Sequence, residues 1–343
     1  MPKKDIIVIG ASAGGIETLK ILVGALPQDF AASVFIVQHT GPDTPGILDI
    51  ILRRAGSLPT DHPRDQERIQ PGHVYVAPPD QHLLIEPGRI RLSRGPKENR
   101  FRPAVDPLFR SAAQVYGPRV IGVILTGGLD DGTAGLWAVK QLGGTAIVQD
   151  PADALVASMP LNALRHVKVN YKVRLEEIAP LLVKLIKTEA DEKGAYEVPE
   201  NLDIEIRIAK QEPSIDLDVR EIWEASSYTC PECHGVLLKL EEGGRVRFRC
   251  HTGHAFSADS LLADLTEDVE ESLWSTIRSI EESVMLMRHL GHHLREDGEP
   301  QTAEEFFRKA EEAQQRAELI RQAVAAHAEL NVERVKEEVE SGP

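Results

Sequence analysis

DIIVIGASAGG, at residues 5–15, joins a run of mainly β-branched side chains to a glycine-rich turn. The apolar run predicts a short buried strand. Apolar residues then recur at helical spacing from Ile16 to Leu26, and Pro27 marks the end of that helix. A strand, a turn and a helix in so few residues predict one half of a βαβ unit.

The turn itself has two interpretations: a phosphate or dinucleotide loop, or a serine nucleophile in a G-x-S-x-G turn. A dinucleotide site favours glycine at position 12 and an acidic residue at the end of the second strand. Here position 12 is Ser12, and the second predicted strand, residues 33–37, ends in Gln38-His39. A histidine there suits a base for Ser12 better than a ribose ligand. Taken alone, Ser12 also fits a helix N-cap.

Composition narrows the function classes. The chain has 343 residues, for which two domains are a reasonable expectation, and a formal net charge of −15. That charge argues against a general nucleic-acid surface. No run reaches the ~18 apolar residues of a membrane span, and the three cysteines are clustered late in the chain. These features predict a cytoplasmic protein without direct membrane insertion.

Residues 1–187 alternate strand-like and helix-like segments, which predicts an α/β fold with a doubly wound, mostly parallel sheet. Three short alternating runs predict inserted β-hairpins, and Asp106 is expected to cap a helix. The further strands are expected at 120–125, 145–149 and 167–169, the hairpin strands at 74–77, 82–85 and 89–92, and the closing helix at 175–187.

Polar side chains follow three of the predicted parallel strands. They are Ser12, His39 and the adjacent pair Asp130 and Asp131. The carboxyl ends of parallel strands share one edge of a sheet, where such folds place their active sites. A nucleophile, a base and an orienting acid are the groups that acyl transfer requires.

Four motifs then give residues 4–187 a resemblance to the catalytic domain of the chemotaxis protein-glutamate methylesterases. They are GASAGG at 10–15, QH at 38–39, RPAVDPLFRSAA at 102–113 and TGGLDDGTAGL at 126–136. Carried over onto these motifs, the resemblance implies a triad of Ser12, His39 and Asp131. Motif register, rather than physical reasoning, selects Asp131 over Asp130. One departure is Gly128-Leu129 in place of the family's usual Met-Gly.

The resemblance also implies the chemistry. The expected substrate is a glutamate γ-methyl ester on methyl-accepting receptors or similar signalling proteins, with glutamine deamidation as a side activity. Candidate oxyanion donors and site-lining residues are Ala13, Gly14, Gly127 and Gly128. No cofactor is expected for catalysis. Many relatives carry a receiver domain before the esterase, whereas here the esterase resemblance begins at Lys4. Two alternatives are therefore expected: an enzyme that is always active, or one that the C-terminal module or a partner controls.

A second, smaller module follows an acidic linker expected at 188–226, in which the alternating residues 202–208 are compatible with an edge strand. Residues 227–256 carry a Cys-x2-Cys pair and a Cys-x3-His pair, which resemble a zinc ribbon. Three thiolates and one imidazole form a closed structural zinc site. The predicted ligands are Cys230, Cys233, Cys250 and His254, with His251 or His234 as alternatives to His254.

Residues 257–335 carry a long apolar stripe at spacings of three and four, interrupted at Gly298-Glu299-Pro300. This pattern predicts a helical hairpin, or a coiled coil with a helical partner. Two function classes therefore remain: an ester hydrolase, or a non-catalytic adaptor that presents the ribbon and the hairpin to a signalling complex. Nucleotide binding at the first turn is the weaker third hypothesis, because His39 stands where an acid is required.

Overall fold

The structure, a computed structural model, describes residues 2–191, 198, 200–212, 223–242 and 244–326. The chain divides into two compact units, Met1–Ser260 and Leu261–Pro343. The finer domain boundaries expected from the sequence stay a prediction. Among the described residues, no helix combines the length and the apolar character needed to cross a membrane.

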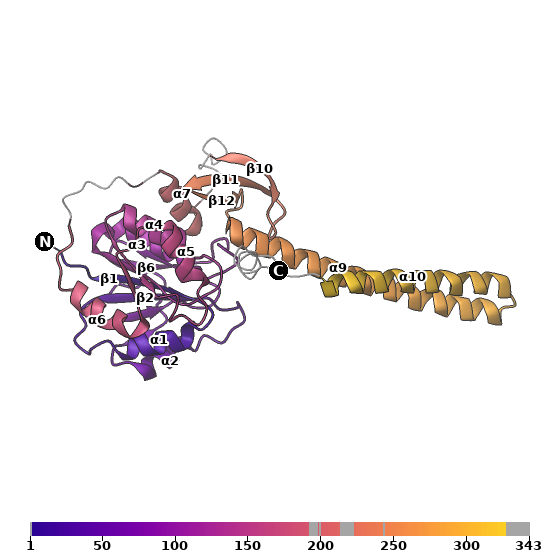
Figure 1. Cartoon of the computed structure of the whole chain (residues 1–343), viewed down its shortest axis with the longest axis horizontal. Coiled ribbons are helices and arrows are strands. Elements are labelled where there is room, and N and C mark those ends of the chain that lie inside the picture. Colours follow the sequence, from indigo (N-terminus) through magenta and orange to yellow (C-terminus); the bar gives the residue numbers. More distant parts are fainter. Residues whose placement is uncertain (1, 192–197, 199, 213–222, 243, 327–343) are drawn as a thin grey trace. The chain divides into compact units, whose positions relative to one another are not determined.

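The first unit is built on a parallel sheet that contains β1 and β2 (Figure 1). The sheet has seven strands, in the order β3-β4-β2-β1-β7-β8-β9. The predicted parallel sheet is confirmed. β1 lies at its centre, and all six of its residues are buried. The strands are β1 (Ile6–Ala11), β2 (Ser33–Gln38), β3 (Thr60–Asp61), β4 (Val74–Val76), β7 (Val120–Ile124), β8 (Thr145–Gln149) and β9 (Tyr171–Val173).

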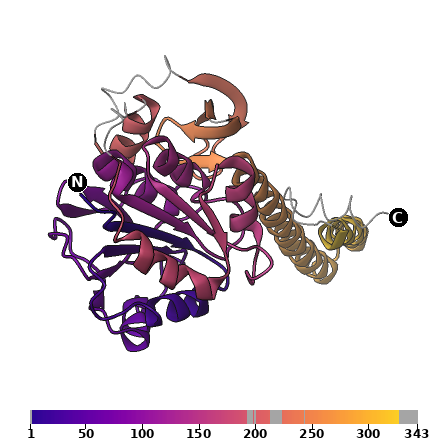
Figure 2. The same cartoon turned by 60° about the vertical axis from the view of Figure 1, so that its left-hand side comes forward.

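Helices cover both faces of this sheet (Figure 2). Side chains of α1, α2 and α6 pack on one face, and those of α3, α4 and α5 pack on the other. The helices are α1 (Gly15–Gly24), α2 (Leu48–Ala55), α3 (Val105–Tyr116), α4 (Thr133–Gln141), α5 (Ser158–His166) and α6 (Leu175–Leu185). A 3-10 turn, Gly117–Arg119, leads into β7.

Two sequence predictions about strands need correction. Only β5 (His82–Glu86) and β6 (Arg89–Ser93) form the expected hairpin, whereas β4 joins the main sheet beside β2. The alternation in β4 has a simple cause: Val74 and Val76 enter one core layer and Tyr75 enters the other. The last strand of the parallel sheet is β9, which begins two residues after the predicted strand at 167–169 ends.

The edge strand considered for residues 202–208 is wrong, because the segment lies in α7 (Glu200–Ala209). Its apolar residues alternate because the helix is buried on two sides. Leu202 and Ile206 pack into the esterase core. Ile204 and Ile208 pack against Trp223 and the ribbon strands. Each pair is spaced i, i+4, so the two stripes together mimic the period of a strand.

The ribbon module follows as a four-stranded sheet in the order β10-β11-β12-β13. All its neighbouring strands are antiparallel. The strands are β10 (Glu224–Thr229), β11 (Val236–Glu242), β12 (Arg245–Cys250) and β13 (Ala255–Ser257). A long helix, α9 (Ala258–Glu296), begins directly after β13.

The second unit, from Leu261, is the predicted helical hairpin, formed by α9 and α10 (Pro300–Ala326). Gly298 has φ of +84° in the turn, a conformation that favours glycine. Buried alanines on α10 pack against Val284 of α9, which allows close helix contact. Docking of this hairpin on a helical partner stays a prediction, and residues 327–335 of the predicted module lie outside the described residues.

Candidate active site and metal cluster

The turn after β1 presents Ser12 at the edge of the sheet. Gly14, with φ of +77°, is the N-cap of α1, and no side chain caps that helix. The left-handed conformation explains a glycine at this position. Gly15 permits a close approach, since a Cβ there would lie 2.0 Å from Gln38 Oε1. Ser12 is therefore not the helix cap, and its hydroxyl remains available to another partner.

That partner is His39. Each ring nitrogen of His39 contacts one of the other two predicted triad residues. Ser12 Oγ is 3.1 Å from Nδ1, and Asp131 Oδ2 is 2.7 Å from Nε2. The three side chains come from the ends of β1 and β2 and from the loop after β7. His39 and Asp131 are both buried. The arrangement gives a serine, a base that can accept its proton, and an acid that orients the base.

Asp131 is held by several donors besides His39. Its Oδ1 accepts hydrogen bonds from Asn99 Nδ2, at 3.0 Å, and from the backbone N–H of Gly132, at 2.9 Å. Its Oδ2 accepts one from the N–H of Val105, at 2.6 Å. Burial alone would raise the pKa of Asp131, but the contacts with His39, Val105 and Asn99 hold it below the usual value. Asp131 is thus kept ionised beside the imidazole.

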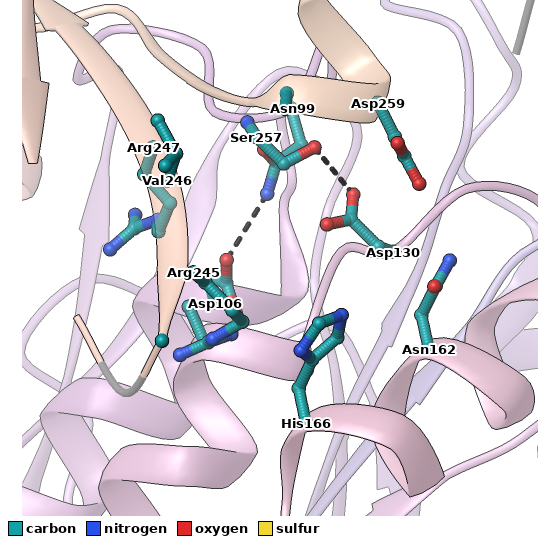
Figure 3. A pocket seen from close by; sticks show the side chains of 13 residues that line it. Asn99, Asp106, Asp130, Asn162, His166, Arg245, Val246, Arg247, Ser257 and Asp259 are labelled. Atoms are coloured by element: carbon teal, nitrogen blue, oxygen red, sulfur yellow. Dashed lines mark hydrogen bonds between the residues drawn. The ribbon is translucent and has the colours of Figure 1, made fainter. Parts of the chain in front are cut away.

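The neighbouring carboxyl groups behave differently. Burial raises the pKa of Asp130 to about 7, although a hydrogen bond from Ser257 opposes the shift. Burial and the charge of Asp131 raise the pKa of Asp106 to about 6. Asp106 lies within the first turn of α3 rather than at its predicted cap, and its Oδ1 accepts the N–H of Gly135. Figure 3 shows both carboxyl groups beside a pocket that Asn99 and Ser257 also line.

An open cleft of about 610 Å³ lies over Ser12 and His39. The ring of Phe101 stacks on His39 with 3.8 Å between centroids, which fixes the plane of the imidazole. The N–H groups of Ala13, Gly14 and Gly128 have no hydrogen-bond partner among the described residues. The N–H of Gly127 donates to the carbonyl of Val156 instead, at 3.0 Å.

Gly127 still lines the site, because a Cβ there would lie 2.8 Å from the Cβ of Ser12 and 2.1 Å from Met159 Sδ. Sequence reasoning did not single out Met159, Phe101 or Asn99. Phe101 and Asn99 lie one and three residues before the RPAVD motif, and this closeness to the motif is the sequence feature that could have pointed to them. Met159 comes from α5 and had no signal of its own.

The four predicted metal ligands lie together in the ribbon. Their donor atoms, one from each of Cys230, Cys233, Cys250 and His254, all lie within 4.8 Å of one another. Cys233 Sγ is 3.6 Å from Cys250 Sγ, and His254 Nδ1 is 3.5 Å from Cys250 Sγ. A tetrahedral Zn²⁺ with ordinary bond lengths requires about 3.8 Å between sulfurs and about 3.6 Å between sulfur and nitrogen. The cluster therefore fits a metal ion, and neither alternative histidine belongs to it.

Comparison with known proteins gives the family of the first part of the chain. The family described as CheB methylesterase matches residues 7–182. The chain belongs to the CheB methylesterase family. A relative from Leptospira interrogans is 41% identical over 190 residues, which are 55% of this chain and 98% of that protein. The crystal structure of the Thermotoga maritima CheB methylesterase catalytic domain has 35% sequence identity and a TM-score of 0.51, covering 53% of this chain and 98% of that one.

Longer relatives carry the same domain. The protein-glutamate methylesterase/protein-glutamine glutaminase 1 of Xanthomonas campestris is 40% identical over 184 residues, and number 2 of Methanosarcina mazei is 34% identical over 192 residues. The present chain spans about half the length of these two relatives, 51% and 52%. The matches cover 52% and 54% of this chain. The ribbon and the hairpin lie outside residues 7–182, which match the CheB methylesterase family.

Proposed function

We propose that the chain is a serine hydrolase that removes methyl groups from glutamate γ-methyl esters on receptor-type signalling proteins. The hydrogen-bonded series Ser12–His39–Asp131 at the edge of an open cleft is the observation that carries this proposal. The names of the Xanthomonas and Methanosarcina relatives supply the substrate class. Their names also support glutamine deamidation, which proceeds through the same acyl intermediate.

His39 Nδ1 accepts the proton of Ser12 as Oγ attacks the ester carbonyl. Asp131 remains ionised, holds the Nε2–H tautomer and stabilises the imidazolium that forms. His39 then protonates the departing methoxide, which leaves as methanol. Water attacks the acyl enzyme with His39 as base, so that glutamate is released and Ser12 regains its proton.

The oxyanion of the tetrahedral intermediate needs donors that are not already engaged. Ala13 and Gly14 meet this condition at the N-terminal end of α1, where the helix dipole favours negative charge. Gly128 is a third candidate. Gly127 is not, because its N–H donates to Val156. Removal of one such donor typically costs ~2.7–4 kcal/mol of transition-state stabilisation.

We further propose a structural zinc ion at Cys230, Cys233, Cys250 and His254. Support comes from the donor distances and from the donor set, since thiolates and imidazole are the ligands that zinc prefers. Four protein ligands leave no position for substrate, so the ion stabilises the ribbon and takes no part in ester hydrolysis. Metal analysis of the purified chain should give one zinc per molecule, and Cys233→Ser should abolish this stoichiometry.

Methanol release from a methylated receptor fragment tests the activity. Wild-type protein should release methanol, and Ser12→Ala should not. Ser57→Ala is the matched control, because Ser57 is exposed and its Oγ donates a hydrogen bond to the Leu26 carbonyl. If the folded wild-type protein released no methanol, the esterase proposal would fail and the adaptor alternative would be favoured.

A further inference from the structure

The segment whose Asn99 contacts the catalytic acid forms a bridge with the edge strand of the ribbon sheet. Residues 97–99 run alongside β13: the N–H of Ala255 donates to the Lys97 carbonyl, at 3.2 Å, and the N–H of Asn99 donates to the Ala255 carbonyl, at 2.8 Å. Glu98 and Ala255 form a parallel bridge. The sheet that carries the cysteine cluster thus ends on the loop beside the active site.

Buried charges reinforce this junction. Arg249 of β12 contacts Glu98 Oε1, at 3.1 Å, and Glu205 Oε1 of α7, at 2.9 Å. Glu98 Oε2 pairs in turn with Arg110 of α3. All four side chains are at most 1% exposed. Breaking such a buried pair leaves an uncompensated charge, so the ribbon and the loop are expected to separate only at a high cost in free energy.

Asn99 connects the ribbon to the catalytic acid. Its Oδ1 accepts the N–H of Ser257, at 2.9 Å, while its Nδ2 donates to Asp131 Oδ1, at 3.0 Å. The same Nδ2 donates to Asp106 Oδ2, at 3.1 Å. A donor on one side and two carboxylates on the other leave one orientation for the amide. Figure 3 shows Asn99 between Ser257 and Asp106, with Ser257 also bonded to Asp130.

The other end of β13 adjoins the cysteine cluster, because His254 immediately precedes Ala255. The carbonyl of His254 accepts the N–H of Cys250, so two of the four cluster residues are also joined through the backbone. A cavity of about 280 Å³ borders Asn99, Asp130 and Ser257. The connection beside this cavity therefore depends on hydrogen bonds more than on close packing.

We propose that Asn99 is a positioning residue through which metal binding at the cysteine cluster controls the reactivity of Ser12. Metal orders β13, β13 holds the amide of Asn99, and Asn99 holds Asp131 in the orientation that His39 requires. This regulation rests on the proposed function, because it acts on the same serine. It assigns the ribbon a role in setting esterase activity.

The test measures Ser12 directly, without a receptor substrate. The readout is the rate at which a fluorophosphonate, a reagent for activated serines, labels the full chain with and without zinc. Zinc is removed by chelation under reducing conditions and then restored. Removal should slow labelling about ten- to hundredfold, because a hydrogen bond to a charged group typically contributes a free energy that corresponds to this factor in rate. Restoration of zinc should reverse the loss.

Two variants assign the effect to Asn99. Asn99→Gly removes the amide and tolerates the local φ of +48°. Asn99→Asp keeps the acceptor for Ser257 but places a carboxylate against Asp131. Both should slow labelling about ten- to hundredfold while retaining one zinc per chain. In Asn99→Gly, removal of zinc should add little further loss, because the connection is already broken. If zinc acted independently of Asn99, zinc removal would slow labelling of Asn99→Gly by the same factor as labelling of the wild type.

Ser226→Ala is the matched control within the ribbon, because Ser226 Oγ bonds to the Leu237 carbonyl, away from β13. It should respond to zinc as wild type does. Near-ultraviolet circular dichroism checks that each variant is folded. Labelling that is insensitive to zinc, or equally sensitive in Asn99→Gly and wild type, would overturn the role of Asn99 alone. Absence of any Ser12 labelling in zinc-loaded wild type would overturn the serine hydrolase proposal as well.

Discussion

Two histidines occupy polar clusters in the first unit, with opposite surroundings. His39 lies between Ser12 and Asp131, and its serine side faces an open cleft of about 610 Å³. His254 points Nδ1 toward Cys230 and Cys250, with which it can complete a closed tetrahedron. An open side leaves room for a reacting ester, whereas a closed set of donors suits an ion that binds no substrate.

Replacement of the nucleophile should have the largest effect on activity. Ser12→Ala removes the attacking oxygen but leaves the cleft, so ester hydrolysis should fall by roughly 10⁴–10⁶-fold. The fold should be unchanged, because the N-cap of α1 is Gly14 and not Ser12. The measurement is kcat for methanol release, with Ser57→Ala as control. Residual activity near that of the wild type would mean that the cleft beside His39 is not the reactive one.

Replacement of the acid is expected to have the next largest effect. In Asp131→Asn the neutral side chain cannot stabilise the imidazolium of His39. Its NH2 group also replaces one of the two carboxylate oxygens, so that one donor is placed opposite other N–H donors. We expect kcat to fall by roughly 10³–10⁴-fold with a small change in KM. Steady-state kinetics over pH 6–9 provide the check. Activity within tenfold of the wild type would exclude Asp131 as the orienting acid.

These catalytic positions were predictable from the sequence for a physical reason. Ser12 and His39 each follow an apolar strand, and parallel strands bring their carboxyl ends to one edge of the sheet. The choice of Asp131 over Asp130 was not predictable in this way, because adjacent residues in a loop carry no periodicity. In the structure the two carboxylates face different partners, His39 and Ser257.

The misassigned segments share a different cause. Residues 202–208 alternate like a strand, yet they lie in α7, and the alternation arises because this helix is buried between the esterase core and the ribbon. Asn99 carries no signal because its role depends on β13, more than 150 positions later in the chain. Periodicity reports the burial of one element, and it does not identify the partner that buries it.

Mutation of the cysteine cluster should mainly lower the stability of the ribbon strands. Cys233→Ser removes one of the four donors, so metal affinity should fall and the ribbon strands β10–β13 should lose order. Hydrogen exchange of residues 224–257 should then accelerate, while β1 and β2 at the centre of the parallel sheet keep their protection. Val236→Ala is a matched control, because this side chain is exposed in the same sheet. Unchanged exchange in Cys233→Ser would contradict a structural metal.

The smallest expected effect concerns Asp130, whose pKa is raised to about 7 by burial. A group with a higher pKa in the folded state binds more protons there than in the unfolded chain. The stability of the wild type should therefore fall as pH rises from about 4, the usual carboxyl value, to about 7. Asp130→Asn cannot ionise, and its oxygen can still accept the hydrogen bond from Ser257.

Asp130→Asn should therefore be more stable than the wild type by roughly 1–3 kcal/mol at pH 8, and the difference should nearly vanish at pH 4, where the carboxyl group is largely protonated in both states. Urea unfolding at the two pH values measures the difference. For Asp131, whose pKa is lowered, the stabilisation is present above the unfolded value near 4 and is lost as pH falls through the lower folded value. If Asp130→Asn lost activity as strongly as Asp131→Asn, the roles of the two neighbours would have to be exchanged.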